Sequence, residues 1–200
     1  MIGILDFKFG NIKSYINIFE RLNIRCDVIS NPKEIKKYNK LILPGMGHFG
    51  NGIEKIKKNQ FFNPLIDIFY DEKTYILGIC VGMQFFFEGS EEGDSEGFGI
   101  LKGKVRRFNI SESKLPNIGW RKIKNIKEDQ IISNNLKNDN FYFSHSYHVC
   151  NCEEEIVTSK SHYEYSFVSS INKNRIYGIQ FHPEKSHFQG INIIKKFYHI

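Results

Sequence analysis

Residues 75–87 read YILGICVGMQFFF, and the rest of the chain is organised around this stretch. Tyr75–Ile79 is a short apolar run with β-branched and aromatic members, which predicts a buried strand. A G-x-C-x-G sequence centred on Cys80 follows, and Val81–Glu88 is expected to continue as a helix. A strand that turns sharply into a helix between small residues is typical of a nucleophile elbow, the turn that presents a reactive side chain.

Cys80 has two interpretations at this point. The flanking glycines suit a strained turn in which larger side chains would clash, and a helix N-terminus favours thiolate over thiol. Those features indicate a cysteine nucleophile. A buried cysteine between two glycines of a packed α/β core is the plainer alternative, because free cysteine is often a small core residue.

The bulk composition predicts one globular domain covering residues 1–200, because 40% of the 200 residues are hydrophobic. The net charge is +6, but the lysines are spread along the chain and no basic run is interleaved with aromatic residues. Nucleic-acid binding is therefore not expected.

The apolar stretches are short. Ile2–Leu5 is too short for a signal peptide, and the longest uncharged stretch, residues 74–87, is too short to span a bilayer. Four cysteines are too few for a disulfide scaffold in a chain of this size, which favours a reducing compartment. We therefore expect a cytoplasmic protein with no membrane contact.

Strand and helix patterns alternate along the first half of the chain. Together they favour an α/β fold with a mostly parallel central sheet flanked by helices. Strands are expected at 2–5, 24–29 and 41–43, a helix at 11–22, and one or two helices within 49–69, broken near Asn63-Pro64.

The pattern changes in the second half. Residues 89–99 are rich in Gly, Glu and Ser and predict a surface loop. From Ile100 onward, short runs predict antiparallel strands added to the sheet. These are expected at 101–108, 119–123, 140–149, 156–159, 165–171 and 175–181, before a final helix at 189–198.

The glycine-rich segment at residues 44–52 matches G-x-G-x-x-G after a strand. A dinucleotide-binding loop would need an acidic residue at the end of the following strand, which ends instead in Gly78-Ile79-Cys80. No Gly-Lys-Ser/Thr is present, which excludes a P-loop. We favour a flexible backbone whose N–H groups point into a neighbouring site.

A second chemically dense segment is GIQFHPEKS, residues 178–186. His182 stands at the end of a predicted strand, where α/β enzymes bind ligands, and Glu184 follows two residues later. Cys80, His182 and Glu184 can then act as nucleophile, proton carrier and orienting acid. Taken alone, a His-Pro-Glu turn is more often structural.

The elbow GICVGMQ, the segment HPEKS and the glycine loop LPGMGHF together resemble class I glutamine amidotransferase domains, over essentially the whole chain. The resemblance implies a flavodoxin-like fold in which Cys80 attacks the glutamine carboxamide, His182 shuttles the proton and Glu184 orients His182. It also implies an oxyanion hole built from the backbone N–H of Val81 and one from Gly45-Met46, after a peptide flip in that loop.

The resemblance further implies a set of residues that bind glutamine. Gln84 would otherwise be an ordinary helix-surface residue, and residues 142–146 would be an ordinary strand. The implied set is Gly47, Gln84, Glu92, Tyr142, His145 and Ser146.

Three further features resemble one branch of that family, the glutaminase subunits of imidazole glycerol phosphate synthases. They are the opening DFKFGN with Ser14, the sequence PNIGW at 116–120, and FSHSY at 143–147. This resemblance implies a heterodimer that passes ammonia to a (β/α)8 cyclase subunit in histidine biosynthesis, with no cofactor. Asn117, Ile118 and Trp120 would lie at the partner interface.

The chain departs from that branch at three positions. The family commonly carries His and Met where this chain has Asn117 and Ile118, and Asn where it has Arg121. A related subunit that supplies ammonia to a sugar amidotransferase of surface-polysaccharide synthesis is therefore an alternative. A catalytically idle binding subunit and a cysteine peptidase or thiol hydrolase on a similar fold are the other function classes.

The histidines and cysteines of residues 145–152 do not predict a metal site. His148, Cys150 and Cys152 alternate along one strand face, which is poor geometry for a tetrahedral zinc site, and no second C-x-x-C exists. We expect no metal and no cofactor.

Overall fold

The computed structural model of the chain describes residues 1–71, 73–133 and 139–200. Its main feature is a nine-stranded sheet with the strand order β2-β1-β3-β4-β13-β12-β11-β8-β9. The strands on its parallel side are β1 (Ile2–Leu5), β2 (Cys26–Ile29), β3 (Lys40–Leu43), β4 (Tyr75–Ile79) and β13 (Ile176–Ile179). All neighbours among these five strands run parallel, which confirms the expected α/β sheet.

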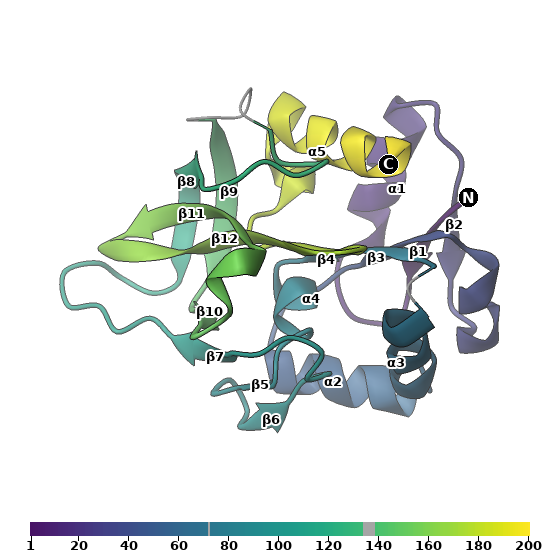
Figure 1. Cartoon of the computed structure of the whole chain (residues 1–200), viewed down its shortest axis with the longest axis horizontal. Coiled ribbons are helices and arrows are strands. Elements are labelled where there is room, and N and C mark those ends of the chain that lie inside the picture. The colour runs from purple at the N-terminus through teal and green to yellow at the C-terminus, as the bar shows by residue number, and fades with distance from the viewer. Residues whose placement is uncertain (72, 134–138) are drawn as a thin grey trace.

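Helices cover both faces of this sheet (Figure 1). In that view α1 and α5 lie above the sheet, whereas α2 and α3 lie below it. The helices are α1 (Ile12–Arg21), α2 (Phe49–Lys58), α3 (Phe62–Asp71), α4 (Val81–Gln84) and α5 (His187–His199), with short 3-10 helices η1 (Pro32–Lys37), η3 (Glu154–Ile156) and η4 (Pro183–Lys185). The predicted helical region 49–69 therefore forms two helices, and Pro64 lies in the first turn of α3, where its missing N–H costs little.

The other side of the sheet is antiparallel. Its strands are β12 (Tyr165–Lys173), β11 (Val157–Tyr163), β8 (Asn117–Asn125) and β9 (Asn140–His145). They extend the parallel part from β13, as predicted for most of the second half. The predicted strand at 140–149 is interrupted at Ser146, where the chain leaves this sheet for a second one.

The second sheet is a departure from the prediction. It has the order β10-β7-β5-β6 and contains β10 (Tyr147–Cys150), β7 (Lys104–Arg107), β5 (Gly89–Ser90) and β6 (Ser95–Glu96). Residues 89–99, expected as a plain surface loop, therefore contain two short strands, and the Glu91 carboxylate accepts the N–H of Arg107 at 2.9 Å.

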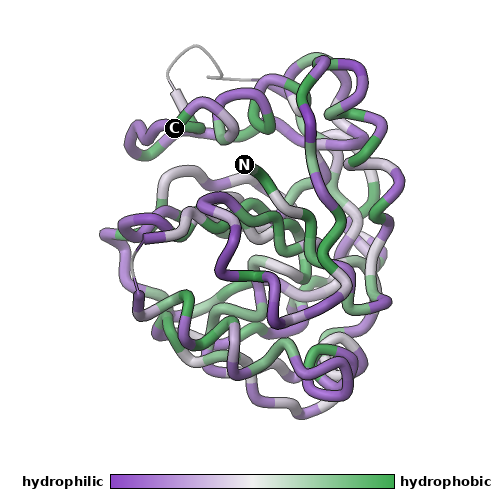
Figure 2. The backbone as a smooth tube through the Cα atoms, turned by 90° about the vertical axis from the view of Figure 1, so that its right-hand side faces the viewer, coloured by the Kyte–Doolittle hydropathy of each residue, from purple (hydrophilic) through white to green (hydrophobic). Residues whose placement is uncertain are grey.

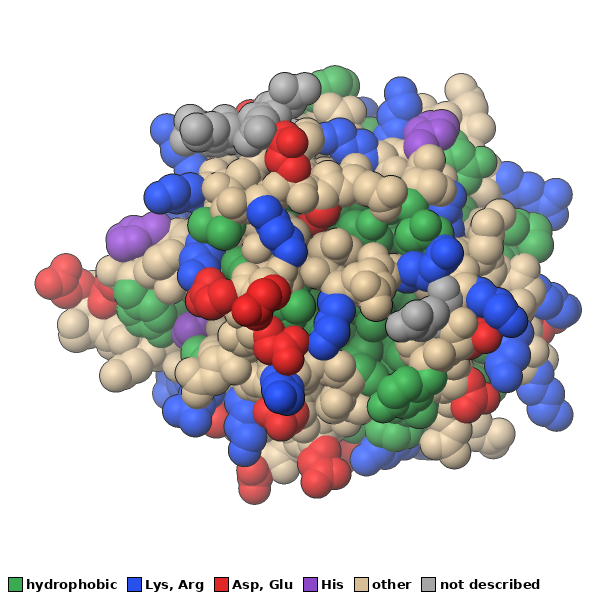
Figure 3. All heavy atoms as spheres, viewed as in Figure 1, with side chains coloured by type: hydrophobic (Ala, Val, Ile, Leu, Met, Phe, Trp, Pro, Cys, Tyr) green, Lys and Arg blue, Asp and Glu red, His purple; other side chains and the backbone are tan. Residues whose placement is uncertain are grey.

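The core lies between the sheet and its helices. Figure 2 shows hydrophobic segments concentrated in the central strands and hydrophilic segments in the outer turns. Phe85, Phe86 and Phe87 are all completely buried. On the face drawn in Figure 3, basic side chains are scattered among acidic ones, in keeping with the spread of lysines along the chain.

The register of β4 and β13 brings distant parts of the chain together. Ile79 pairs with Ile179, and the N–H of Cys80 donates to the carbonyl oxygen of Ile179 at 2.8 Å. The carboxyl ends of these two parallel strands therefore meet at one edge of the sheet. Whatever follows Ile79 and Ile179 in the sequence must lie side by side there.

Candidate active site

Cys80 occupies a strained turn between β4 and α4. Its φ of 53° and ψ of −112° lie in a region that residues with side chains rarely adopt. The turn is held by the hydrogen bond from the Cys80 N–H to Ile179, and the N–H of Met83 donates to the Cys80 carbonyl oxygen at 3.1 Å. A non-glycine residue persists in such a conformation only where the surroundings hold it, so the geometry of a nucleophile elbow is present.

The glycine loop packs directly against this turn. A Cβ added to Gly82 would lie 2.0 Å from the carbonyl oxygen of Leu43, and one added to Gly45 would lie 2.1 Å from the Gly82 nitrogen. Backbone therefore meets backbone at this point, and only glycine fits. The glycine loop therefore lies beside the cysteine, but it is shorter than expected, because residues 49–52 form the first turn of α2.

Gly82→Ala is expected to destabilise the chain by about 1–3 kcal/mol or more, because the clash is with backbone and not with a movable side chain. Gly99→Ala is the matched control: a Cβ there meets nothing within 4 Å, and its φ of +65° costs only about 1–2 kcal/mol. Thermal unfolding followed by circular dichroism compares the two variants. A Gly82→Ala variant that melts no lower than Gly99→Ala would contradict the packing argument.

His182 and Glu184 stand beside the cysteine. The N–H of His182 donates to the Tyr142 carbonyl oxygen at 2.8 Å, which fixes the backbone on which the ring sits. Nδ1 of His182 lies 2.7 Å from Oε1 of Glu184, and both side chains are almost completely buried. Since the carboxylate can only accept, Nδ1 donates to it, and Nε2 is the ring atom left to face the sulfur.

The charges of the three groups are coupled. Burial acts to lower the pKa of His182, but the Cys80 thiolate and then Glu184 outweigh it and raise that pKa to about 10. A hydrogen bond between His182 and Cys80 is among the interactions that raise it. The imidazolium is therefore favoured while the sulfur is anionic. When the sulfur loses its charge in a covalent bond, the ring becomes a stronger acid.

The second carboxylate oxygen of Glu184 is also buried. Within residues 1–71, 73–133 and 139–200, no group satisfies hydrogen-bond geometry with this atom, Oε2. The hydroxyl of Tyr15, on α1, interacts with the same carboxylate. Burial first, and then the charges of Glu184 and Cys80, hold the pKa of Tyr15 well above its usual value, so this hydroxyl stays protonated beside them.

A hollow of about 290 Å³ opens over the sulfur. The side chain of Gln84 is buried at its edge, and its Oε1 meets no donor in the described part of the chain. A buried acceptor without a partner is costly and suits a site that receives a donor from a ligand. The lining residues are Met46, Gly47, Cys80, Val81, Gln84, Glu92, Pro116, Ser144, His145, Ser146 and Tyr147.

The sequence profile of the family described as "Glutamine amidotransferase class-I" matches residues 3–200. The chain belongs to this family. It is 38% identical over 202 residues to "Imidazole glycerol phosphate synthase subunit HisH" of Leptospira interrogans, covering 98% of both chains. It is 40% identical over 201 residues to the protein of the same name from Methanocaldococcus jannaschii, again covering 98% of both chains.

Two solved structures show the same fold. The crystal structure of a glutamine amidotransferase superposes with a TM-score of 0.78 at 14% identity, covering 99% of this chain and 97% of the other. The structure of PurLQS from Thermotoga maritima gives 0.76 at 14% identity, with the same coverage. At such identities the likeness concerns the fold alone.

Most of the residues expected to bind glutamine line the hollow. Gly47, Gln84, Glu92, His145 and Ser146 all do so, as do Met46 and Val81 of the expected oxyanion hole. Glu92 also accepts the N–H of Phe49 at 2.8 Å and so caps α2. Burial lowers the pKa of His145 to about 3, so its ring is neutral at physiological pH.

The expected place of Tyr142 in the glutamine site is wrong. This residue does not line the hollow, because its ring packs against Trp120, its partner across the β8–β9 ladder, with the ring centroids 6.0 Å apart. Its backbone carbonyl instead holds His182, as described above. The hollow contains Pro116, Ser144 and Tyr147 in its place, all within or beside the two motifs of the synthase branch.

Asn117 is a second correction, because its side chain is fully buried and cannot present itself to a partner. Its Nδ2 lies 3.2 Å from Nε2 of His145, and its Oδ1 accepts from Nε of Arg121 at 3.1 Å. Ile118 and Trp120, the other expected interface residues, are 54% and 41% exposed. Alternate residues of β8 thus face the site and the solvent.

Gln180 was missed by sequence reasoning. It is completely buried, and its Nε2 lies 3.5 Å from Sγ of Cys80. A signal was available: residues two apart on an extended chain point to the same side, so a Gln two residues before His182 shares its direction.

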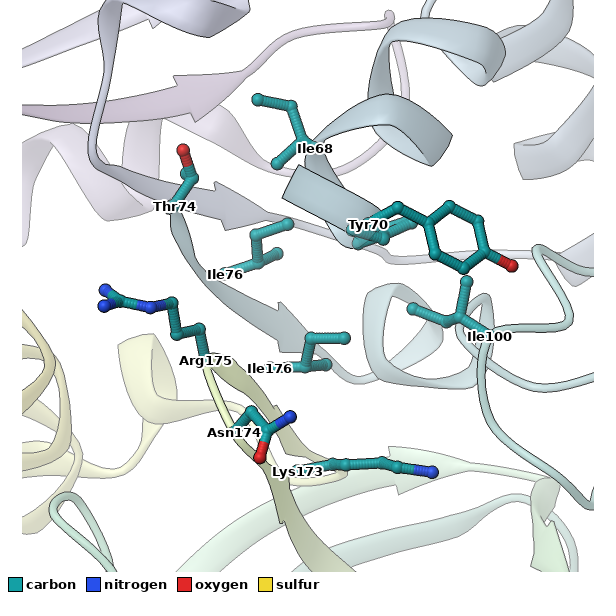
Figure 4. Close-up of a pocket in the computed structure, with 10 residues that line it drawn as sticks. Ile68, Tyr70, Thr74, Ile76, Ile100, Lys173, Asn174, Arg175 and Ile176 are labelled. Carbon is teal, nitrogen blue, oxygen red and sulfur yellow. The ribbon is translucent and has the colours of Figure 1, made fainter. Parts of the chain in front are cut away.

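A second hollow, of about 190 Å³, lies at the amino ends of β4 and β13, away from Cys80 (Figure 4). Its polar groups are engaged elsewhere: Arg175 stacks on the Tyr75 ring at 4.4 Å, and Lys173 pairs with Glu153 at 3.1 Å. Across the described residues, we find no cluster of three His, Cys, Asp or Glu side chains able to hold a metal, and no helix long and apolar enough to cross a membrane.

Proposed function

We propose that this chain is the glutaminase subunit of an imidazole glycerol phosphate synthase, and that it hydrolyses glutamine to glutamate and ammonia. The observation that carries the proposal is the buried arrangement of Cys80, His182 and Glu184 beside a hollow with an unpaired amide oxygen. Identity of 38–40% over 98% of the chain to proteins named HisH supports the choice of synthase.

The first half-reaction is acylation of the enzyme. The Cys80 thiolate attacks the carboxamide carbon of glutamine. The carboxamide oxygen, which becomes negative, accepts hydrogen bonds from the backbone N–H of Val81 and one from the Gly45-Met46 segment. As the C–N bond breaks, imidazolium His182 gives its proton to the departing nitrogen, which leaves as ammonia. Loss of the sulfur charge makes this proton transfer easier, since that charge is the main cause of the raised His182 pKa.

The second half-reaction restores the enzyme. Neutral His182 takes a proton from a water molecule, which attacks the γ-glutamyl thioester. The C–S bond breaks, glutamate leaves, and the thiolate–imidazolium pair forms again. Glu184 holds the ring in one tautomer through both steps, because Nδ1 remains bonded to its carboxylate.

Substrate orientation is assigned to the hollow. Oε1 of Gln84 and the carboxylate of Glu92 accept from the α-ammonium group of glutamine, while Gly47, His145 and Ser146 complete the wall. Binding there leaves the carboxamide over Cys80. Tyr142 contributes its backbone carbonyl, which accepts the N–H of His182.

The partner is a cyclase subunit with a (β/α)8 barrel, which receives the ammonia. Its docking face includes Ile118 and Trp120 on β8 together with Phe188 at the start of α5, which is 71% exposed. His187 links the two elements, since its ring stacks on that of Trp120 with centroids 4.9 Å apart. Large apolar side chains exposed in one region are typical of a protein–protein interface.

Reconstitution tests the proposal. The chain is mixed with the cyclase subunit of its own organism, and glutamate release and imidazole glycerol phosphate formation are measured with and without the cyclase's phosphorylated ribulosyl substrate. Glutamine-dependent product formation, with glutamate release that rises when that substrate is bound, is expected. Absence of glutamate release in the complete mixture would refute the assignment.

The alternative is a glutaminase that serves a sugar amidotransferase. The observation that favours it is the pair Asn117 and Arg121. These residues replace the usual ones of the branch and are joined by a partly buried hydrogen bond. Affinity purification of the tagged chain from its native cells distinguishes the two assignments. The partner recovered in stoichiometric amount is either the histidine-pathway cyclase or a paralogous cyclase that acts in sugar amidation.

A further inference from the structure

The helix after Cys80 is too short for its dipole to contribute much to a thiolate at this position. α4 spans only Val81–Gln84, a single turn, whereas a helix to Glu88 was expected. The partial charge at a helix N-terminus comes from many aligned peptide dipoles, and one turn supplies few of them. Side chains that reach the sulfur can stabilise a thiolate directly. Two such side chains follow β13: His182, already described, and Gln180.

Gln180 reaches the sulfur from a rigid position. Its backbone N–H donates to the Ser169 carbonyl oxygen at 2.9 Å, so β12 holds the residue, and its side chain is completely buried. Nε2 lies 3.5 Å from Sγ of Cys80, within range for a hydrogen bond to sulfur. None of the steps proposed above uses this amide.

The direction of this contact is determined by its neighbours. Nε2 of Gln84 lies 3.1 Å from the carbonyl oxygen of Tyr147, which can only accept, so the Gln84 atom at that position must be the NH₂ group. The same NH₂ lies 3.0 Å from the Gln180 amide, which must therefore present its oxygen to Gln84. The Gln180 NH₂ is then directed at Cys80. This order of donors follows from a backbone carbonyl and does not depend on how either amide was assigned.

We propose that Gln180 donates a hydrogen bond to the Cys80 thiolate and stabilises it, and that Gln84 sets the direction of that bond. The proposal rests on the proposed function only in taking Cys80 as the nucleophile. A hydrogen bond to a charged acceptor is stronger than one to a neutral acceptor, so the contact favours thiolate over thiol. Because Gln84 also lines the hollow, the glutamine site and the sulfur share one hydrogen-bonded chain.

Other ionisable groups act on the same sulfur. His182 faces it directly, Glu184 acts through His182, and the hydroxyl of Tyr15 approaches from α1. Each of these remains in place when Gln180 is changed. A change in sulfur ionisation in a Gln180 variant therefore reports on the amide itself.

The test is the pH dependence of Cys80 alkylation by iodoacetamide in the isolated chain, without glutamine or partner. Mass spectrometry of the peptide that contains Cys80 separates its reaction from those of Cys26, Cys150 and Cys152. Gln180→Met removes the donor at similar volume, and Gln180→Glu places an acceptor against the sulfur. Gln130→Met is the matched control, because that amide bonds the Tyr177 hydroxyl at 2.6 Å instead of the sulfur.

In Gln180→Met the midpoint of the pH dependence of Cys80 alkylation is expected to rise by about one pH unit. This corresponds to about tenfold less thiolate at any pH below the midpoint. Gln180→Glu is expected to raise it further, and Gln130→Met to leave it unchanged. Gln84→Leu, which frees the Gln180 amide to rotate, gives a smaller rise and provides a test if both Gln180 variants fail to fold. An unchanged midpoint in folded Gln180 variants, or in Gln84→Leu when those do not fold, would overturn the inference.

Failure of this inference differs from failure of the proposed function. Alkylation requires only a reactive sulfur, so its pH profile is measurable whatever the natural substrate is. A wild-type chain that alkylates at Cys80 but never releases glutamate would refute the glutaminase assignment and leave the role of Gln180 in place. Normal glutamine turnover with an unshifted profile in the variants would refute the inference alone.

Discussion

Replacing Cys80 by alanine is expected to abolish glutamine-dependent synthesis while the partner continues to work with added ammonium salt. The thioester cannot form without the sulfur, and loss of a nucleophile of this kind costs on the order of 10⁶-fold in rate. A φ of 53° costs alanine no more backbone strain than it costs cysteine, so the turn and the partner interface are expected to keep their structure. Rates with glutamine and with ammonium chloride are compared in the reconstituted complex.

Cys26→Ala is the control for this variant. Cys26 is a free cysteine on β2, at the edge of the sheet farthest from the antiparallel strands, and its loss is expected to change neither rate. Loss of the ammonia-dependent reaction in Cys80→Ala would mean that the substitution damages the partner or its docking, and would count against the role assigned to the sulfur. Retention of glutamine-dependent synthesis would remove that role altogether.

The local features of the site could be predicted because their cause is local. The strand-to-helix turn at Cys80 follows from an apolar run and two glycines, and the structure explains the second glycine by the nearby carbonyl of Leu43. The meeting of Cys80 with His182 has a different cause. It depends on β13 pairing with β4 in one register, Ile79 beside Ile179, and pairing across a hundred residues leaves no local pattern.

The length of α4 was mispredicted for a physical reason. Phe85, Phe86 and Phe87 are consecutive and all completely buried. Three adjacent residues point in three directions around a helix, so a surface helix cannot bury them all. After α4 the backbone continues in tighter turns, in which the N–H groups of Phe86 and Phe87 donate to carbonyls three residues back, and all three rings enter the core. A one-turn helix contributes little dipole at the sulfur, and the side chains of His182 and Gln180 contact it instead.

Side-chain direction explains the two misplaced site residues. Tyr142 and Asn117 belong to segments that do form part of the site, so their motifs were informative. Which face each side chain takes depends on the neighbouring strand: Tyr142 packs on Trp120, and Asn117 turns inward to His145. That choice requires the cross-strand register, which a single sequence does not supply.

Glu184→Gln is expected to lower kcat for glutamine hydrolysis by about 10³–10⁴-fold, by analogy with neutralising the carboxylate of a catalytic triad. Glutamine should still bind with a similar KM, because Glu184 is buried behind His182 and does not line the hollow. In this variant the amide NH₂ of the new side chain at position 184 can donate to Nδ1 of His182. The ring proton would then sit on Nε2 and point at the sulfur. The ring could then no longer accept a proton from water.

The pH profile distinguishes this loss from simple misfolding. Burial alone acts to lower the pKa of His182, and Glu184 is one of the groups that raise it to about 10. Without the carboxylate that pKa falls, so the imidazolium that protonates the departing nitrogen persists only at lower pH. The residual activity of Glu184→Gln should therefore shift toward acid. Glu54→Gln, at an exposed position on α2, is the control. Activity within tenfold of the parent chain, with an unshifted profile, would mean that the carboxylate does not orient His182.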